Sequence, residues 1–120
     1  MRIAIVGAGI SGLASAALLA GAGHEVRVFE RAPTLASLGA GLLISPCGME
    51  VLERLGVLKA VAERSAVIGS LLGTTATGRR VLDLRYSSWG GRDVHGLGVH
   101  RGVLFESLRG AALAAGADIV

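Results

Sequence analysis

A Gly-x-Gly-x-x-Gly sequence between two apolar runs constrains the fold of this chain more than any other feature. The first run, residues 2–6, has the composition of a buried strand and leads directly into the glycines. Residues 11–22 follow with apolar side chains at helical spacing, and residues 25–30 alternate as a second strand. The three glycines are Gly7, Gly9 and Gly12. This order of strand, glycine turn, helix and strand predicts an α/β fold with a parallel sheet.

Each glycine of this pattern has a physical role. Gly7 permits a sharp turn off the strand, Gly9 lets a pyrophosphate approach the backbone, and Gly12 lets the helix pack closely against the sheet. The helix N-terminus offers free N–H groups and the positive end of its dipole to phosphates. Glu30 lies 18 residues after Gly12, where a carboxylate can accept hydrogen bonds from ribose hydroxyls. The segment is therefore predicted to be a Rossmann-like dinucleotide-binding βαβ unit.

Two other interpretations explain less of the same segment. A glycine-rich turn in an ordinary α/β protein accounts for the glycines but leaves Glu30 without a role. Residues 3–23 carry no charge and could suggest a signal peptide or a membrane span. Early glycines disfavour a hydrophobic helix, and only Arg2 would form the charged region before it. We therefore predict no targeting segment and no membrane span.

Composition excludes several other functions. The chain has 120 residues, 52% hydrophobic and 18% charged, which suits one modest domain with a core. Its net charge of +3 is spread over both halves and its aromatic residues are few, so we expect no nucleic-acid partner. The single cysteine, Cys47, excludes an internal disulfide and fits a reducing compartment, which we take to be the cytoplasm. His24, His95 and His100 are scattered, so no metal site is predicted.

Patterns in the rest of the chain predict further elements. Leu13, Ala14, Ala17 and Leu18 would form the buried face of the first helix. Ser45 and Pro46 would begin a second helix that ends at Gly56, with Met49, Val51, Leu52 and Leu55 buried. The remaining expectations are a loop at 32–40, a strand at 42–44, a short helix at 57–64, a hairpin of 67–75 with 79–84, a flexible loop at 85–97 and a helix at 102–115.

The last three residues, 118–120, read as the start of another strand. Domain boundaries usually fall in exposed polar linkers, whereas the last residues of this sequence have the pattern of an apolar strand. We therefore expect a truncated chain whose sheet leaves apolar surface available for self-association.

Three motifs together resemble a known enzyme family. They are Glu30-Arg31, the run from Gly39 to Pro46 with Leu55-Gly56, and the run from Val99 to Leu104 with Leu108. In this order they are similar to class A flavin-dependent monooxygenases, the aromatic hydroxylases that include para-hydroxybenzoate and salicylate hydroxylases. The middle run fits that family's Gly-x-Gly-Ile-x-Leu-x-Pro-Asn pattern. The resemblance implies an N-terminal fragment that binds FAD rather than NAD.

The resemblance also implies roles for individual residues. The pyrophosphate would contact Gly7, Gly9, Ser11 and Gly12. Glu30 would bind the adenosine ribose, and Arg31 would lie against the adenosine end. Gly41 and Leu42 would approach the flavin side, and Arg101 would reach the cofactor from the start of its helix. An arginine suits the last position because its planar fork binds phosphate oxygens or stacks on a ring. The alternative for Arg101 is a surface ion pair, for example with Glu106.

Two positions depart from the family pattern. Cys47 replaces the usual asparagine, and Gly48 replaces a common alanine. Cys47 is either a reactive thiol near the cofactor or a small buried filler, and the second interpretation is favoured.

The implied activity is hydroxylation of a small organic substrate with NADPH or NADH and O₂. We expect this substrate to be aromatic. Residues 1–66 and 99–120 would then belong to the FAD-binding domain, and residues 67–98 to the start of a β-rich substrate domain. No catalytic residue can be assigned within these residues. The alternatives are another FAD-dependent oxidoreductase, of the reductase or amine oxidase type, and a non-catalytic dinucleotide-binding module.

Overall fold

The computed structural model of the chain describes residues 1–32 and 39–120, and its first layer is a parallel sheet. The strands lie in the order β1-β2-β8, so β2 is hydrogen-bonded on both sides. Their bounds are β1 Arg2–Val6, β2 Glu25–Phe29 and β8 Asp118–Ile119. The predicted α/β fold with a parallel βαβ unit is confirmed.

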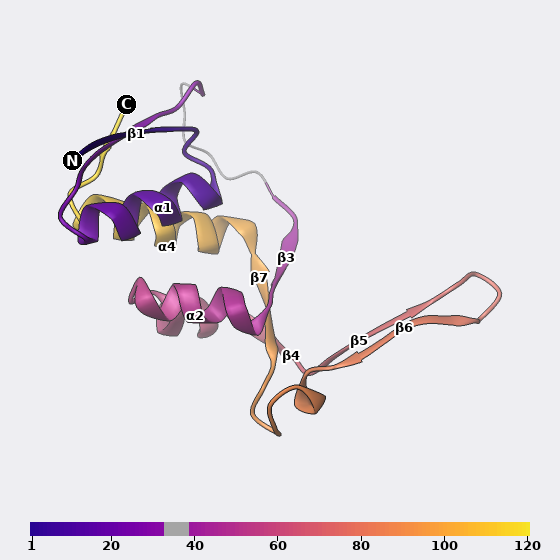
Figure 1. Ribbon diagram of the computed structural model, residues 1–120. Coiled ribbons are helices and arrows are strands. Elements are labelled where there is room, and N and C mark those ends of the chain that lie inside the picture. Colours follow the sequence, from indigo (N-terminus) through magenta and orange to yellow (C-terminus); the bar gives the residue numbers. More distant parts are fainter. Residues whose placement is uncertain (33–38) are drawn as a thin grey trace.

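Two helices, α1 (Ile10–Gly21) and α4 (Arg101–Ala114), lie side by side and cover one face of this sheet (Figure 1). The buried residues of α1 are Leu13, Ala16, Ala17 and Ala20. Leu18 is 43% exposed, so its predicted place on the buried face is wrong. The reason is that α4 packs beside α1 along the stripe of small residues, and Leu18 points away from that contact.

A second sheet is antiparallel and has the order β3-β7-β4. Its strands are β3 Gly41–Ile44, β7 Gly96–His100 and β4 Ser65–Ile68. The predicted loop at 85–97 is therefore wrong at its end, because Gly96 and Leu97 already belong to β7. A Cβ at Gly96 would lie 3.0 Å from the Ile44 carbonyl oxygen. Because the close approach of β3 requires a glycine at position 96, the sequence at the start of β7 resembles that of a loop.

The predicted hairpin is present but begins later than expected. It joins β5 (Ser70–Thr74) to β6 (Arg80–Arg85) through a turn in which Gly78 has φ +86°, and it projects away from the helices (Figure 1). The expected single strand at 67–75 is divided at Gly69, because β4 pairs with β7 whereas β5 pairs with β6. A short 3₁₀ helix, η1 (Tyr86–Ser88), follows the hairpin.

The second predicted helix is confirmed as α2 (Pro46–Arg54), and α3 (Leu58–Ala62) follows it. The Ser45 hydroxyl accepts the Gly48 N–H at 3.4 Å, so Ser45 caps the helix as expected. Leu52 is buried, but Val51 is 38% exposed, which corrects its predicted burial. The predicted loop at 32–40 falls largely outside the described residues. Within those residues no helix is long and apolar enough to cross a membrane.

Candidate functional site

The topology brings two helix N-termini to the same edge of the parallel sheet. Helix α1 connects β1 to β2, and α4 leads into β8, so both helices run opposite to the strands. Their N-termini therefore lie beside the ends of β1 and β2, at the right of the helix pair in Figure 1. In open parallel sheets this carboxyl-end edge is where ligands bind.

The glycines at this edge have the geometry that their predicted roles require. Gly7 has φ +97° and donates its N–H to the Phe29 carbonyl at 2.8 Å, which ties the turn to β2. A Cβ at Gly12 would collide with the Gly7 carbonyl oxygen, so only glycine allows α1 to approach the strand. A Cβ at Gly9 would meet no atom within 4 Å in the described structure. The backbone at Gly9 is thus open to an incoming group.

The first turn of α1 presents backbone donors that have no carbonyl partner among the residues that the structure describes. Its first helical hydrogen bond runs from Leu13 N–H to the Gly9 carbonyl at 2.9 Å. The preceding N–H groups of Ile10, Ser11 and Gly12 therefore have no carbonyl partner within the helix. Gly9, as N-cap, supplies no side chain to satisfy them. An open glycine beside free helix N–H groups fits a pyrophosphate.

Glu30 follows β2, and its side chain links the loop after β1 to the segment after β2. Its Oε2 accepts the Ala8 N–H at 2.7 Å, and its Oε1 accepts the Ala32 N–H at 2.9 Å. A carboxylate offers about four lone-pair sites, so acceptor capacity remains for ribose hydroxyls. The Glu30 backbone N–H donates to the Val120 carbonyl at 2.8 Å, which fixes the residue at the end of the sheet.

The same hydrogen bonds set the charge of Glu30. The amides of Ala32 and then Ala8 lower the pKa of the Glu30 carboxyl from its ordinary value, partial burial opposes them, and the amide and the charge of Arg31 lower it further. Glu30 is therefore an ionised acceptor at neutral pH. Arg31 itself is exposed beside this carboxylate.

Arg101 is the first residue of α4 and lies exposed at the same edge. Its backbone N–H donates to the Ala40 carbonyl at 3.2 Å. Glu106 lies 3.8 Å from Arg109, and no Arg101–Glu106 pair occurs among residues 1–32 and 39–120. The ion-pair alternative for Arg101 is not supported by this arrangement.

Gly41 and Leu42 are brought beside Arg101 by the antiparallel pairing of β3 with β7. Gly41 lies opposite His100, and Leu42 opposite Val99. His100 then caps α4, because its Nδ1 accepts the Gly102 N–H at 3.2 Å. The edge therefore combines the glycine loop, Glu30, Arg31, the start of β3 and Arg101.

Three contributors at this edge were not identified from the sequence. The Ala8 amide gives no side-chain signal, because any residue could supply it. His100 had a signal, since it directly precedes a helix, and Gly39 belongs to a Gly-x-Gly repeat whose first member was given no role. Both signals depend on knowing which strand lies beside the start of α4.

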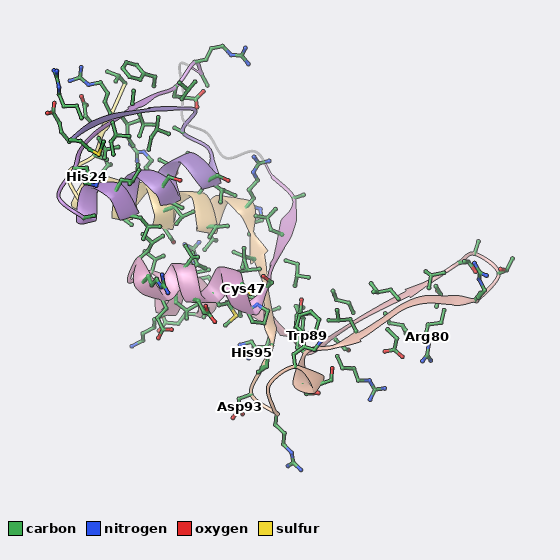
Figure 2. All side chains as sticks on the ribbon, in the orientation of Figure 1. His24, Cys47, Arg80, Trp89, Asp93 and His95 are labelled. Atoms are coloured by element: carbon green, nitrogen blue, oxygen red, sulfur yellow. The ribbon has the colours of Figure 1, made fainter. Side chains whose placement is uncertain are left out.

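Cys47 is exposed on the first turn of α2, so its predicted role as a small buried filler is wrong (Figure 2). Its helix buries Leu52, whereas Cys47 lies on a part of α2 that is left at the surface. Of the residues described, no three His, Cys, Asp or Glu side chains form a group that could hold a metal ion.

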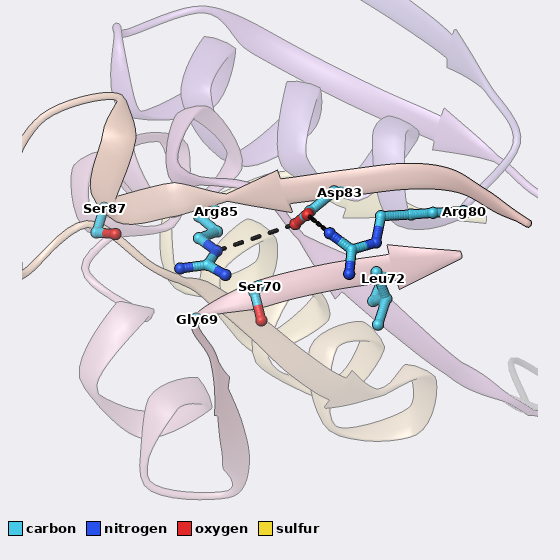
Figure 3. A pocket seen from close by; sticks show the side chains of 7 residues that line it. All are labelled: Gly69, Ser70, Leu72, Arg80, Asp83, Arg85 and Ser87. Atoms are coloured by element: carbon cyan, nitrogen blue, oxygen red, sulfur yellow. Dashed lines mark hydrogen bonds and ion pairs between the residues drawn. The ribbon is translucent and has the colours of Figure 1, made fainter. Parts of the chain in front are cut away.

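A polar hollow of about 290 Å³ lies on the projecting hairpin, away from the glycine loop (Figure 3). Asp83 accepts a hydrogen bond from Arg80 at 2.6 Å, and Arg85 lies 3.9 Å from the same carboxylate. The acid thus offsets part of the positive charge here. This hollow is separate from the edge that the sequence predicted.

Comparison with known proteins agrees with this geometry. The family model described as "FAD binding domain" matches residues 1–119. A 3-amino-4-hydroxybenzoate 2-monooxygenase of Streptomyces cremeus is 44% identical over 89 residues, which cover 74% of this chain and 19% of that protein. A 6-hydroxynicotinate 3-monooxygenase of Pseudomonas fluorescens is 46% identical over 65 residues, 54% of this chain and 17% of that protein.

Solved structures share the fold over nearly the whole chain. A 2-methyl-3-hydroxypyridine-5-carboxylic acid oxygenase, solved in a tetrameric form, gives a TM-score of 0.82 at 28% identity, covering 99% of this chain and 30% of that one. The anhydrotetracycline hydroxylase OxyS of Streptomyces rimosus gives 0.83 at 26% identity, covering 100% and 24%. The chain spans less than a fifth of the length of the curated relatives named above.

Proposed function

The chain belongs to the FAD-binding domain family, and on that premise we propose that it forms the adenosine-side FAD site of a flavin-dependent monooxygenase. The fit of the carboxyl-end edge to a dinucleotide supports this proposal. The glycine loop and free α1 N–H groups suit a pyrophosphate, and the ionised Glu30 suits a ribose.

Each residue at the edge then has a proposed contact. Gly7, Gly9, Ser11 and Gly12 surround the pyrophosphate, while Glu30 accepts from the adenosine ribose and Arg31 lies against the adenosine end. Gly41 and Leu42 approach the flavin side through backbone atoms. Arg101 binds the cofactor from the start of α4, where its fork and the helix dipole both favour negative charge.

When bound, FAD supplies electron transfer from NADPH or NADH and oxygen transfer from O₂. The residues described here bind and orient the cofactor. Both named curated relatives are monooxygenases whose names specify hydroxylated aromatic acids. We accordingly propose a small aromatic substrate, and these names favour a monooxygenase over a reductase or an amine oxidase.

Residues 1–66 and 99–120 are proposed as FAD-binding, and residues 67–98 as the start of the substrate domain. Strand β4 (Ser65–Ile68) crosses the first boundary and pairs with β7, so the two parts share a sheet. The chain's single cysteine supports a reducing compartment, the cytoplasm. The 120-residue chain in isolation is proposed to self-associate through the free edge of β1.

The observation that carries the proposal is the Glu30 carboxylate, held by two amides at the end of β2 with acceptor sites to spare. We expect Glu30→Ala in the full-length protein to raise the FAD dissociation constant about tenfold or more, since hydrogen bonds to charged groups are strong. Fluorescence titration of the apoprotein with FAD measures this. Glu53→Ala removes an exposed carboxylate from α2 and serves as the matched control. Unchanged FAD affinity in a folded Glu30→Ala protein would remove Glu30 from the site.

A further inference from the structure

Gly39 lies against the side chain of Arg101 with no room for a Cβ atom. A Cβ built at Gly39 would lie 2.9 Å from the Arg101 Cβ and 3.3 Å from its Cδ. The first distance is shorter than Cβ contacts found in proteins, and the second is unusually tight. The Arg101 stem therefore occupies the space that a side chain at position 39 would need.

The requirement for glycine at position 39 is one of space. The nearest atoms to a Cβ there all belong to the Arg101 side chain, at 2.9, 3.3 and 3.6 Å. What excludes a larger residue is Arg101.

The backbone around Gly39 also holds Arg101. The carbonyl of Ala40 accepts the Arg101 N–H at 3.2 Å, and Gly41 pairs with His100. The segment before β3 thus runs along the first turn of α4. It fixes the arginine backbone, while contact with Cβ and Cδ restricts the direction of the guanidinium.

We infer that Gly39 is a positioning residue whose missing side chain lets the Arg101 guanidinium reach the cofactor. This inference rests on the proposed role of Arg101 in FAD binding. An alanine at position 39 pushes the Arg101 stem aside, because the contact to Cδ lies close to the charged head. The charge stays, but the fork no longer meets its target in the right orientation.

The test is a double-mutant cycle for FAD affinity in the full-length protein. Gly39→Ala is expected to raise the FAD dissociation constant about tenfold, the scale of one charged hydrogen bond. In an Arg101→Gly background, which lacks both the guanidinium and the Cβ that a side chain at position 39 would meet, the same change is expected to have no further effect. Gly110→Ala is the matched control. Gly110 lies in α4, the helix of Arg101, and a Cβ there would meet no atom of the described structure within 4 Å.

Three outcomes distinguish this inference from the proposed function. Wild-type affinity in Gly39→Ala, or an equal loss in the Arg101→Gly background, overturns the positioning role. Wild-type affinity in Arg101→Gly instead overturns the proposed function of Arg101 itself. Should Gly39→Ala not fold, Gly39→Ala/Arg101→Gly removes the colliding atoms and is expected to restore folding; failure to do so contradicts the steric argument.

Discussion

The Glu30 carboxylate accepts hydrogen bonds from Ala8, which follows β1, and from Ala32, which follows β2. Its ionisation therefore contributes to the stability of the fold as well as to the proposed cofactor site. The Ala32 and Ala8 amides lower the pKa of this carboxyl in the folded chain. The unfolded chain lacks these amides and keeps the ordinary pKa, about 4.3 for Glu. The folded state therefore binds fewer protons, and its stability rises with pH across this range.

We expect Glu30→Gln to be less stable than the wild type at pH 7, with the difference shrinking as pH falls. The contribution of Glu30 is complete above the ordinary Glu pKa and is lost as pH falls through the lower folded pKa. Urea denaturation of the apoprotein at a series of pH values between about 7 and 3 measures the difference, since this interval spans the Glu titration. A constant difference over the whole series would show that the amides do not discriminate the charged form.

The role of a single residue could be predicted from the sequence where steric constraints allow only one residue type. Gly7 and Gly12 could be assigned because a positive φ and a helix–strand contact exclude other residues. Ala8 could not, because its contribution is a backbone N–H. Gly39 could not either, since its neighbour Arg101 is distant in sequence and depends on the β3–β7 pairing.

At the scale of elements, the packing of α2 on β3 explains one departure from the family pattern. A Cβ at Gly48 would lie 2.8 Å from the Cγ2 methyl of Ile44. Ile44 stands where the quoted pattern has Leu, which carries no methyl at that branch. The branched Ile44 and the small Gly48 therefore compensate one another.

We expect Gly48→Ala to lower the free energy of unfolding by up to about 2 kcal/mol. Overpacking costs about 1–3 kcal/mol and the gain in helix propensity returns at most about 1 kcal/mol. The double variant Gly48→Ala/Ile44→Leu should recover most of this loss, because the colliding methyl is gone. Denaturant unfolding of the four proteins gives the coupling free energy, and strictly additive changes would contradict the compensation.

Helices and the first two strands could be predicted because their periodicity or capping is local. The Ser45–Pro46 start of α2 and the turn at Gly78 are of this kind. Strand β7 could not be predicted, because Gly96 and Gly98 are small where neighbouring strands approach, which reads as a loop. The division of residues 67–75 at Gly69 depends on two different partners, and no local pattern records that.

At the scale of the whole molecule, the helices of residues 1–32 and 39–120 cover only one face of the parallel sheet. On the other face Val6 is 90% exposed and Phe29 is 46% exposed. Strand β1 pairs with β2 alone, so its second edge has free backbone groups in the described structure. The class of fold followed from the sequence, whereas this open face follows from which elements the 120 residues contain.

We therefore expect the 120-residue chain on its own to self-associate. Apolar side chains next to a free strand edge form a surface on which another copy can add. Sedimentation velocity over a range of concentrations measures the association, and Val6→Lys on the exposed face should weaken it. A chain that stays monomeric at high micromolar concentration would contradict this expectation.

The identity of the cofactor released by the full-length protein tests the central claim most directly. The account predicts a yellow protein that releases FAD in a 1:1 ratio on denaturation, identified by chromatography and absorbance. It also predicts that the apoprotein regains this absorbance with FAD and not with NAD. A folded, colourless protein that binds NAD but not added FAD would contradict the account.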